Sequence, residues 1–479
     1  MQSVTQDGEQ SFLIIGGGIT GLSLALELGR HNKSVTLVEA DEQLGGNIRS
    51  VTEQGWHMEL GPNTLMAKPS LYKLINSLNL TEKAIFPPEA SRKRYVVKDG
   101  KLIALPDGLK SALKSPLIGF EGWRHLLTEP FRKPASHEET LAGFVRRRLG
   151  QNILSHFVDP FVSGVYAGAP ERLSAKAAFP RLYYLEQAHG SLLRGGIAQM
   201  RNSKKKRAKY HEVGFPEEWR GKLVSFPGGL STLINGIKHE LERLPNVRLV
   251  TGSRVEKINR ENHTWHAVDQ KGQAFVGHKL ILTTPASVSG SLLSNVNAEL
   301  QSELESIVYP PLAAVVLGYP ERAVKHPLDG FGMLIPSKEK KQTLGVLFSS
   351  TLFPQRAPKG HVLFTCFIGG RRNPAVSDQS DEQLVNTVSS EISQLLDIDA
   401  QPVFTKVARW SQAIPQYDIG HLARTAKIDQ IAQTCADLHL IGNWRDGISV
   451  GDCIDNGHAM AQTLLGAETH TGTAAAVIE

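Results

Sequence analysis

Residues 12–21, with the sequence FLIIGGGITG, decide the fold of this chain. Four apolar residues have the pattern of a short buried strand and lead into a Gly-x-Gly-x-x-Gly turn. Residues 22–30 follow with the spacing of a helix, and a second β-like run at 34–38 ends at Glu39. This order of strand, glycine turn, helix, strand and acidic residue predicts a βαβ unit that binds a dinucleotide. The alternative is a βαβ turn that holds no ligand.

Each glycine of this turn has a physical purpose. Gly16 allows the tight turn, Gly18 allows a pyrophosphate to approach the backbone, and Gly21 allows the helix to pack closely on the strands. The pyrophosphate is expected at the helix N-terminus, where free N–H groups favour an anion. Glu39 can accept hydrogen bonds from ribose hydroxyls, which favours FAD or NAD over a 2′-phosphorylated cofactor. The residues assigned to the cofactor from this motif are Gly16, Gly18, Ile19, Thr20, Gly21, Glu39 and Ala40.

The segment after Glu39 favours FAD. A Gly-Gly pair followed by an arginine resembles the second signature of the flavin amine-oxidase superfamily, and residues 61–64 resemble the loop that passes the flavin ring there. This resemblance implies further cofactor contacts from Gly45, Gly46, Asn47, Arg49, Gly61, Pro62, Asn63 and Thr64. Arg49 can pair with the pyrophosphate, although by itself it could equally be a solvated surface cation.

A second glycine-rich turn lies near the C-terminal end, where a strand at 438–441 leads into residues 442–452 and a helix at 453–465. The N-terminus of this helix is expected to face the N1–C2=O edge of the reduced flavin, where negative charge develops. The resemblance adds to the cofactor set Val255 beside the adenine, together with Trp410, Gly442, Ser449, Val450 and Asp452.

Four stretches of sequence point to one family within this superfamily. Residues 161–168, residues 226–230, Trp410 with residues 415–417, and residues 442–452 together look like the protoporphyrinogen oxidase family. The family resemblance implies that a porphyrinogen loses six electrons in three flavin cycles, each passing a hydride to flavin N5, while oxygen becomes hydrogen peroxide. It implies neither a catalytic side chain nor a metal. One departure is Ala169, where the family usually has Asp.

The resemblance also implies the substrate-binding residues, which are Asn63, Arg94, Gly168, Leu334, Leu347 and Phe367. Arg94 matches the arginine that pairs with a propionate, and bidentate pairing would fix the orientation of the carboxylate. The other interpretations are a solvated charge for Arg94, a simple turn for Gly168, and core packing for the apolar residues. Strands are expected at 331–335, 343–348 and 362–368.

These motifs predict a mixed α/β fold with a discontinuous Rossmann-like domain. We expect an FAD-binding domain at 1–90, 221–304 and 400–479, and a substrate-binding sheet domain at 91–110 and 305–399. A helical insertion at 111–220 is expected to contact a membrane. Within it, apolar residues at helical spacing lie beside cations over 106–132, and Pro116 is expected to divide this stretch into two helices. A packed helical subdomain would have the same pattern.

Composition narrows the partners of this 479-residue chain. A net charge of +6 is too small to indicate nucleic acid, and the basic run at 201–209 is interpreted as a solvated loop or a phospholipid contact. Cys366, Cys435 and Cys453 lack the spacing of metal or redox pairs. With no secretory signal expected, we predict a cytoplasmic protein, peripheral on the membrane. Handover of the product to ferrochelatase and assembly as a homodimer are left open.

Two alternatives to protoporphyrinogen oxidation remain at this stage. Coproporphyrinogen III carries four propionates and would favour a more basic pocket mouth. A non-catalytic FAD-fold binding or escort protein would be colourless on purification, but the intact glycines of both turns argue against it.

Overall fold

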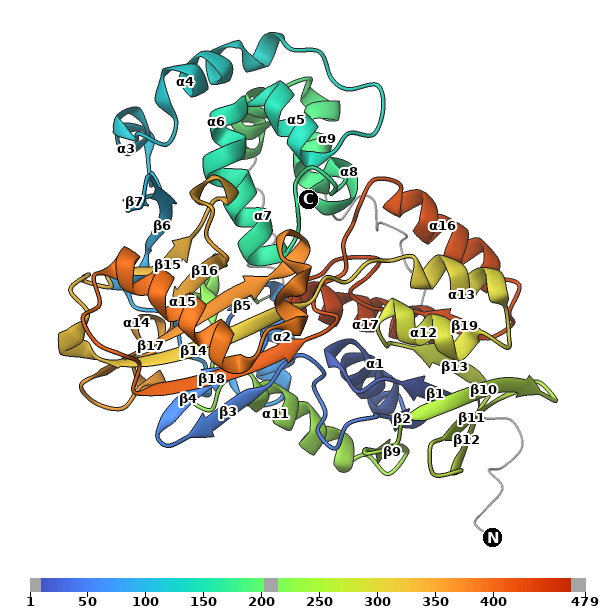
Figure 1. Cartoon of the computed structure of the whole chain (residues 1–479). Helices are drawn as coiled ribbons and strands as arrows, with labels where there is room; N and C mark the ends of the chain where they lie inside the picture. The colour runs from blue at the N-terminus through green and yellow to red at the C-terminus, as the bar shows by residue number, and fades with distance from the viewer. Residues whose placement is uncertain (1–9, 202–213, 467–479) are drawn as a thin grey trace.

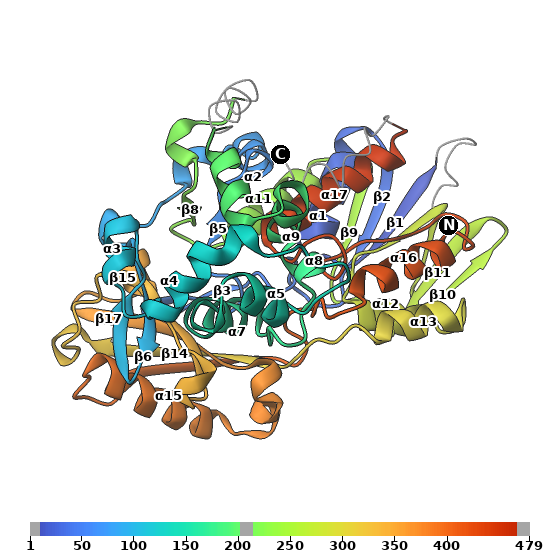
Figure 2. The ribbon, with the colours of Figure 1, turned by 90° about the horizontal axis from the view of Figure 1, so that it is seen from above.

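A computed structural model describes residues 10–201 and 214–466 (Figure 1). The expected mixed α/β fold is confirmed. Two large sheets lie side by side, with a group of helices above the junction between them, and Figure 2 shows the same arrangement from above.

The first sheet is parallel and has the strand order β19-β13-β1-β2-β9. Its strands are β1 (Ser11–Ile15), β2 (Ser34–Val38), β9 (Val247–Val250), β13 (Lys279–Leu282) and β19 (Leu438–Leu440). They come from three separate stretches of the chain, and the last strand pairs with β13. The two glycine turns, more than 400 residues apart in sequence, therefore follow strands of one sheet.

Both faces of this sheet are covered, which explains the continuous apolar run in β1. Phe12 and Ile14 pack in one hydrophobic cluster, and Leu13 and Ile15 pack in another on the opposite face. The first cluster joins helices α1 (Ile19–Arg30), α2 (Pro69–Ser77), α11 (Ser231–Glu242) and α17 (Val450–Leu464). The second joins β10 (Val255–Glu261), β11 (Thr264–Asp269), β12 (Ala274–Gly277), α12 (Ala286–Leu293), α13 (Ala298–Glu305) and α16 (His421–Ala432).

The second sheet has seven strands in the order β18-β14-β17-β16-β15-β6-β7. Its neighbouring pairs are antiparallel except β15 with β6. The strands are β6 (Lys93–Lys98), β7 (Lys101–Ala104), β14 (Leu312–Pro320), β15 (Gly330–Leu334), β16 (Thr343–Phe348), β17 (His361–Gly369) and β18 (Phe404–Trp410). Helix α15 (Asp381–Leu396) buries one face, and the opposite face looks toward the helical group.

One predicted domain boundary is wrong. The FAD-binding domain was expected to resume at residue 400, but β18 pairs with β14 along Leu312–Gly318 and belongs to the seven-stranded sheet. The chain returns to the parallel sheet only after Trp410. The error arose because alternating residues in β18 give no sign of which sheet its backbone will join.

The helical group lies between β7 and the short strand β8 (Leu223–Val224). It contains α3 (Leu109–Lys114), α4 (Gly119–Thr128), α5 (Leu141–Arg148), α6 (Gln151–Ile153), α7 (Asp159–Tyr166), α8 (Ala175–Ala178), α9 (Pro180–His189) and a helix at 192–201. The expected break at Pro116 is confirmed, because α3 ends before it and α4 begins after it. Most of the basic run at 201–209 lies outside the described residues. Over 10–201 and 214–466, no helix has the length and apolar character needed to span a bilayer.

Candidate active site

The first cradle is the turn from β1 to α1. Gly16 has a φ of +114°, a conformation that favours glycine, and a Cβ on Gly21 would lie 2.1 Å from the Gly16 carbonyl oxygen. Thr283, which sequence reasoning missed, donates its hydroxyl to that oxygen over 2.8 Å. Gly16 and Gly21 are thus required by the protein's own packing.

Gly18 is different, because a Cβ built there would meet no described heavy atom within 4 Å. It is the N-cap of α1, and its lack of a side chain leaves the first turn without a side-chain cap. Ile19, Thr20 and Gly21 therefore begin a helix whose N–H groups suit an anion. Open space beside a glycine and uncapped helical donors together fit a pyrophosphate.

Glu39 lies at the end of β2, beside this turn. Its carboxylate accepts hydrogen bonds from the Gly17 N–H over 2.6 Å and from the Asp41 N–H over 2.9 Å. These bonds fix the carboxylate and leave lone pairs for ribose hydroxyls. The Ser253 N–H donates to the Glu39 carbonyl over 3.0 Å, which brings the segment leading to Val255 beside the predicted ribose site. Ala40 is exposed next to Glu39.

The turn at Gly45 and Gly46 lies against the glycine turn between β1 and α1. The Gly45 N–H donates to the Gly17 carbonyl over 2.8 Å, and Gly45 and Gly46 have φ values of +114° and +59°. The Arg49 guanidinium pairs with Asp41 and lies 5.9 Å from the centre of the Trp410 ring. Arg49 is therefore at the cradle with its charge already paired, and its contact with a pyrophosphate stays a prediction.

The loop at 61–64 lies between the cradle and the second sheet. A Cβ on Gly61 would lie 1.8 Å from the carbonyl oxygen of Asn47, so only glycine allows this close approach. The Asn63 side chain donates to the Gly61 carbonyl over 2.9 Å, and Trp410 donates to the Leu60 carbonyl over 3.0 Å. Pro62 and Thr64 lie in the same loop, half-buried.

The second cradle is the turn into α17. Ser449 caps the helix, since its hydroxyl accepts from the Asp452 N–H over 3.1 Å and the Asp452 carboxylate accepts from the Ser449 N–H over 3.2 Å. Lys68 pairs with Asp452, so these side chains are engaged within the protein. Val450 begins the helix directly after Ser449.

The loop before α17 is held by Tyr417, another residue that sequence reasoning did not assign to the site. Its hydroxyl donates to the Asn443 carbonyl over 2.7 Å and accepts from the Gly447 N–H over 3.0 Å. Gly442 precedes this loop, and a Cβ there would lie 2.9 Å from the Trp444 ring. The family-like stretch at 415–417 therefore holds the loop before α17 in place, which no local sequence pattern predicted.

Helices α1 and α17 run side by side in the same direction. Gly457 lies against the first turn of α1, where a Cβ would be 2.6 Å from the Thr20 carbonyl oxygen. Farther along, Gln462 donates to Glu27 over 3.3 Å. Gly457 is seven residues into α17, whereas the residues it meets lie about three residues into α1, so the N-terminus of α17 extends roughly 6 Å beyond that of α1. The two N-termini are thus staggered along one line, as an extended dinucleotide requires.

The seven-stranded sheet brings four predicted substrate residues onto one face. The pairing aligns Arg94, Gly332, Leu347, Thr365 and Val316 in one row, and Val96, Leu334, Gly345, Phe367 and Ala314 in the next. Their neighbours on the same strands pack against α15, so these rows face the other way. Arg94 is exposed and lies 5.4 Å from the centre of the Phe331 ring.

This face is bounded on two sides. Helix α7 lies against it, since a Cβ on Gly164 would be 2.4 Å from the Leu334 side chain. Asn63 and Thr365 line one cavity, which places the loop of the first cradle opposite the sheet. Leu334, Leu347 and Phe367 are only half-buried, which favours a surface for a ligand over a fully packed core.

A side chain at the position of Gly168 would not point toward that sheet face. A side chain there would lie 2.7 Å from the Gln416 amide oxygen and 3.3 Å from Val162 and Leu173. The protein itself therefore explains why this residue is glycine, and any contact with a substrate would come from the backbone.

Comparison with known proteins agrees with this geometry. The family model described as flavin containing amine oxidoreductase matches residues 19–465. Protoporphyrinogen oxidase 2 of Arabidopsis thaliana is 32% identical over 94% of this chain and 93% of that protein. Coproporphyrinogen III oxidase of Bacillus subtilis is 27% identical over 96% and 98%. A solved structure from Exiguobacterium sp. 255-15 shares the fold, with a TM-score of 0.80 at 23% identity, covering 95% of this chain and 99% of that one.

Proposed function

The chain belongs to the family of flavin-containing amine oxidoreductases, and from this premise we propose that it oxidises protoporphyrinogen IX to protoporphyrin IX. It is an FAD-dependent oxidoreductase. The observation that carries the proposal is the juxtaposition of two staggered helix N-termini with an apolar sheet face that ends in one arginine. The similarity to oxidases supports turnover over the alternative of a binding protein without turnover.

When bound, FAD supplies the hydride acceptor and delivers the electrons to oxygen, giving hydrogen peroxide. The protein's own residues bind and orient. The first turn of α1 and Gly18 suit the pyrophosphate, and Glu39 suits the ribose. Leu334, Leu347 and Phe367 would hold a flat macrocycle, with the Arg94 guanidinium pairing one propionate.

Charge on the sheet face favours the two-propionate substrate over coproporphyrinogen III. Of the ten residues in the two rows from β6 to β14, Arg94 is the one that is charged. The first row continues into β18 at Lys406, whose ammonium is paired with Glu53. Four propionates would require more cations at the mouth to offset their charge. The similarity to coproporphyrinogen III oxidases nevertheless makes that reaction the second candidate.

The decisive experiment mixes the purified holoenzyme with protoporphyrinogen in the absence of oxygen and follows the flavin absorbance. We expect bleaching of the oxidised flavin, and recovery with formation of hydrogen peroxide when air is admitted. Porphyrin fluorescence then compares turnover of the two porphyrinogens. Equal or faster turnover of coproporphyrinogen would reject the first choice, and no bleaching by either would reject porphyrinogen oxidation.

For location, we propose peripheral attachment to the cytoplasmic face of an anionic membrane. Helices α3 and α4 stand away from both sheets (Figure 1), and their apolar side chains are exposed: Leu109, Leu113, Phe120, Leu127 and the nearby Phe131. Lys110, Lys114 and Lys133 are exposed among them, which suits anionic headgroups. Arg124 is also exposed but is paired with Glu121.

Sedimentation with vesicles tests the membrane contact. We expect binding to vesicles that contain phosphatidylglycerol, weaker binding to phosphatidylcholine alone, and loss of binding in Leu113→Glu/Phe120→Glu. Equal sedimentation of this variant would contradict the assignment of α3 and α4. Handover to ferrochelatase and a homodimer stay predictions, to be checked by co-sedimentation and light scattering.

A further inference from the structure

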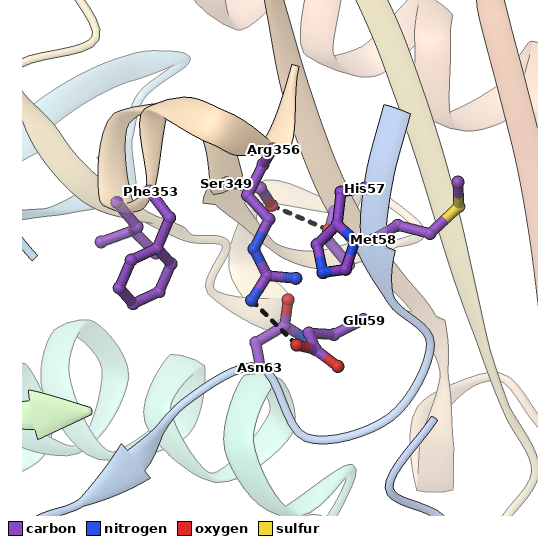
Figure 3. A pocket seen from close by; sticks show the side chains of 9 residues that line it. His57, Met58, Glu59, Asn63, Ser349, Phe353 and Arg356 are labelled. Carbon is purple, nitrogen blue, oxygen red and sulfur yellow. Dashed lines mark hydrogen bonds and ion pairs between the residues drawn. The ribbon is translucent and has the colours of Figure 1, made fainter. Parts of the chain in front are cut away.

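A small cavity lies between the loop of the first cradle and the seven-stranded sheet (Figure 3). It is small, with room for one small molecule or ion. Its lining comes from the short strand β4 (Trp56–Glu59), the loop at 61–64, the turn of α14 (Ser349–Leu352) with residues 353–356, and β17. The lining residues are His57, Met58, Glu59, Asn63, Ser349, Leu352, Phe353, Arg356 and Thr365.

The cation of this cavity is Arg356, which is 2% exposed. Its Nη2 donates to the Glu59 carboxylate over 2.8 Å and to the Ser225 hydroxyl over 3.0 Å. A guanidinium has five N–H bonds, so three remain on Nε and Nη1. Neither nitrogen has an acceptor among residues 10–201 and 214–466. Figure 3 shows the guanidinium reaching in between Phe353 and His57.

The other polar groups of the lining do not compete for these donors. Glu59 also accepts from the Leu230 N–H over 2.9 Å and from the Ser50 hydroxyl over 2.7 Å. Ser349 and Thr365 bond to each other over 2.8 Å. Burial and the nearby Arg356 lower the pKa of His57 to about 4, so its ring is neutral at neutral pH. Its Nε2 also lacks a partner in the described part of the chain.

We propose that this cavity binds one small anion, monatomic or diatomic, against Nε and Nη1 of Arg356. Buried donors on a charged group require an acceptor, and the size of the cavity excludes a carboxylate-bearing substrate. Two sources share this chemistry. One is a halide such as chloride. The other is superoxide, the anion that dioxygen becomes when it takes one electron from the reduced cofactor, with no bond formed or broken.

Bromide is the probe for binding, and gluconate replaces it at constant ionic strength because gluconate is too large for the cavity. For the FAD-loaded protein, the melting temperature should rise with bromide and then saturate, since a ligand that binds only the folded state stabilises it. Crystals grown in bromide should show an anomalous peak beside Arg356. No rise and no peak would overturn the proposal.

Leu352→Phe fills the cavity while retaining the bridge between Arg356 and Glu59, so it should abolish the bromide effect. The matched control is Leu193→Phe, the same change at an exposed leucine, which should respond like the wild type. An equal response of Leu352→Phe would overturn the proposal. If that variant does not fold, the anomalous map of the wild-type protein decides.

Reoxidation by air distinguishes the two sources. The flavin is first reduced with dithionite, so this measurement does not depend on the proposed porphyrinogen substrate. If the oxygen-derived anion uses the site, bromide should slow reoxidation several-fold, and most at low oxygen. If reoxidation is unchanged while bromide still binds, the occupant is a halide from solution. Failure of porphyrinogen to bleach the flavin would reject the proposed function and leave the bromide result intact.

Discussion

Replacing Gly457 with alanine should loosen the contact that aligns the two cradles. A Cβ at this position would lie 2.6 Å from the Thr20 carbonyl oxygen and 3.1 Å from the Leu24 nitrogen. Ordinary contact begins near 3.4 Å, so α1 and α17 must separate by about 0.8 Å. Because the opposing atoms belong to the backbone, no rotamer change can relieve the clash.

The expected magnitude combines two opposing effects. Alanine gains about 1 kcal/mol over glycine from helix propensity, whereas overpacking of a rigid contact costs about 2–3 kcal/mol. We therefore expect a net loss of about 1–2 kcal/mol in the free energy of unfolding. Since both helix N-termini move, the affinity for FAD should also fall, by about tenfold if 1.4 kcal/mol of the strain is expressed in binding.

Denaturant unfolding of the FAD-free protein and titration with FAD, followed by flavin fluorescence, measure the two effects. The matched control is Gly196→Ala in the helix at 192–201, where a Cβ would meet no described atom within 4 Å. This control should keep its FAD affinity and gain up to about 1 kcal/mol. A Gly457→Ala variant with unchanged stability and unchanged FAD affinity would refute the claim that this glycine sets the helix spacing.

Three further predictions concern single side chains. Arg94→Ala should raise KM several-fold and leave flavin content and kcat nearly unchanged, because the arginine binds a propionate equally in ground and transition states. An unchanged KM would show that Arg94 does not bind the substrate. Arg92→Ala, a change at a neighbouring exposed arginine, is the control. Glu59→Gln should lower the unfolding free energy by about 3–5 kcal/mol, because it leaves the charge of Arg356 buried without its counter-ion; a loss below 1 kcal/mol, measured with urea, would contradict this. His57 has a pKa of about 4 in the folded protein against the usual 6.5. As the pH drops from 6.5 to 4, the unfolded chain therefore binds a proton at His57 before the folded protein does, and the free energy of unfolding falls by about 3 kcal/mol in total. His57→Gln should make urea midpoints between pH 6.5 and pH 4 less pH-dependent, and identical slopes would exclude His57 as a source of acid sensitivity.

Local patterns predicted the elements of this fold well because their causes are local. The apolar run of β1 is buried on both faces, and the glycines that follow it are required by the turn itself. The strand at 343–348 was predicted with the bounds that β16 has, whereas α1 begins at Ile19, three residues earlier than expected. That difference reflects the missing side chain at Gly18, which leaves no polar cap to mark the start.

Local patterns failed where a residue acts on a distant partner. Tyr417 holds a loop 26 and 30 residues away, and Arg356 bonds to Glu59 across 297 residues. Nothing in the neighbouring sequence of either residue indicates its partner. The same holds for β18, whose alternation suits either sheet and whose backbone joins the seven-stranded one.

The sequence by itself determined the dinucleotide motif, the second glycine turn and the candidate residues, because glycine conformation, helix ends and strand periodicity depend on neighbours in the chain. Only the tertiary structure decided how these parts meet. It aligned two helix N-termini through Gly457, set Arg94, Leu334, Leu347 and Phe367 on one sheet face, and closed a cavity around Arg356. The physical reason is that contacts between segments hundreds of residues apart arise from packing and sheet register, which no local window of sequence contains.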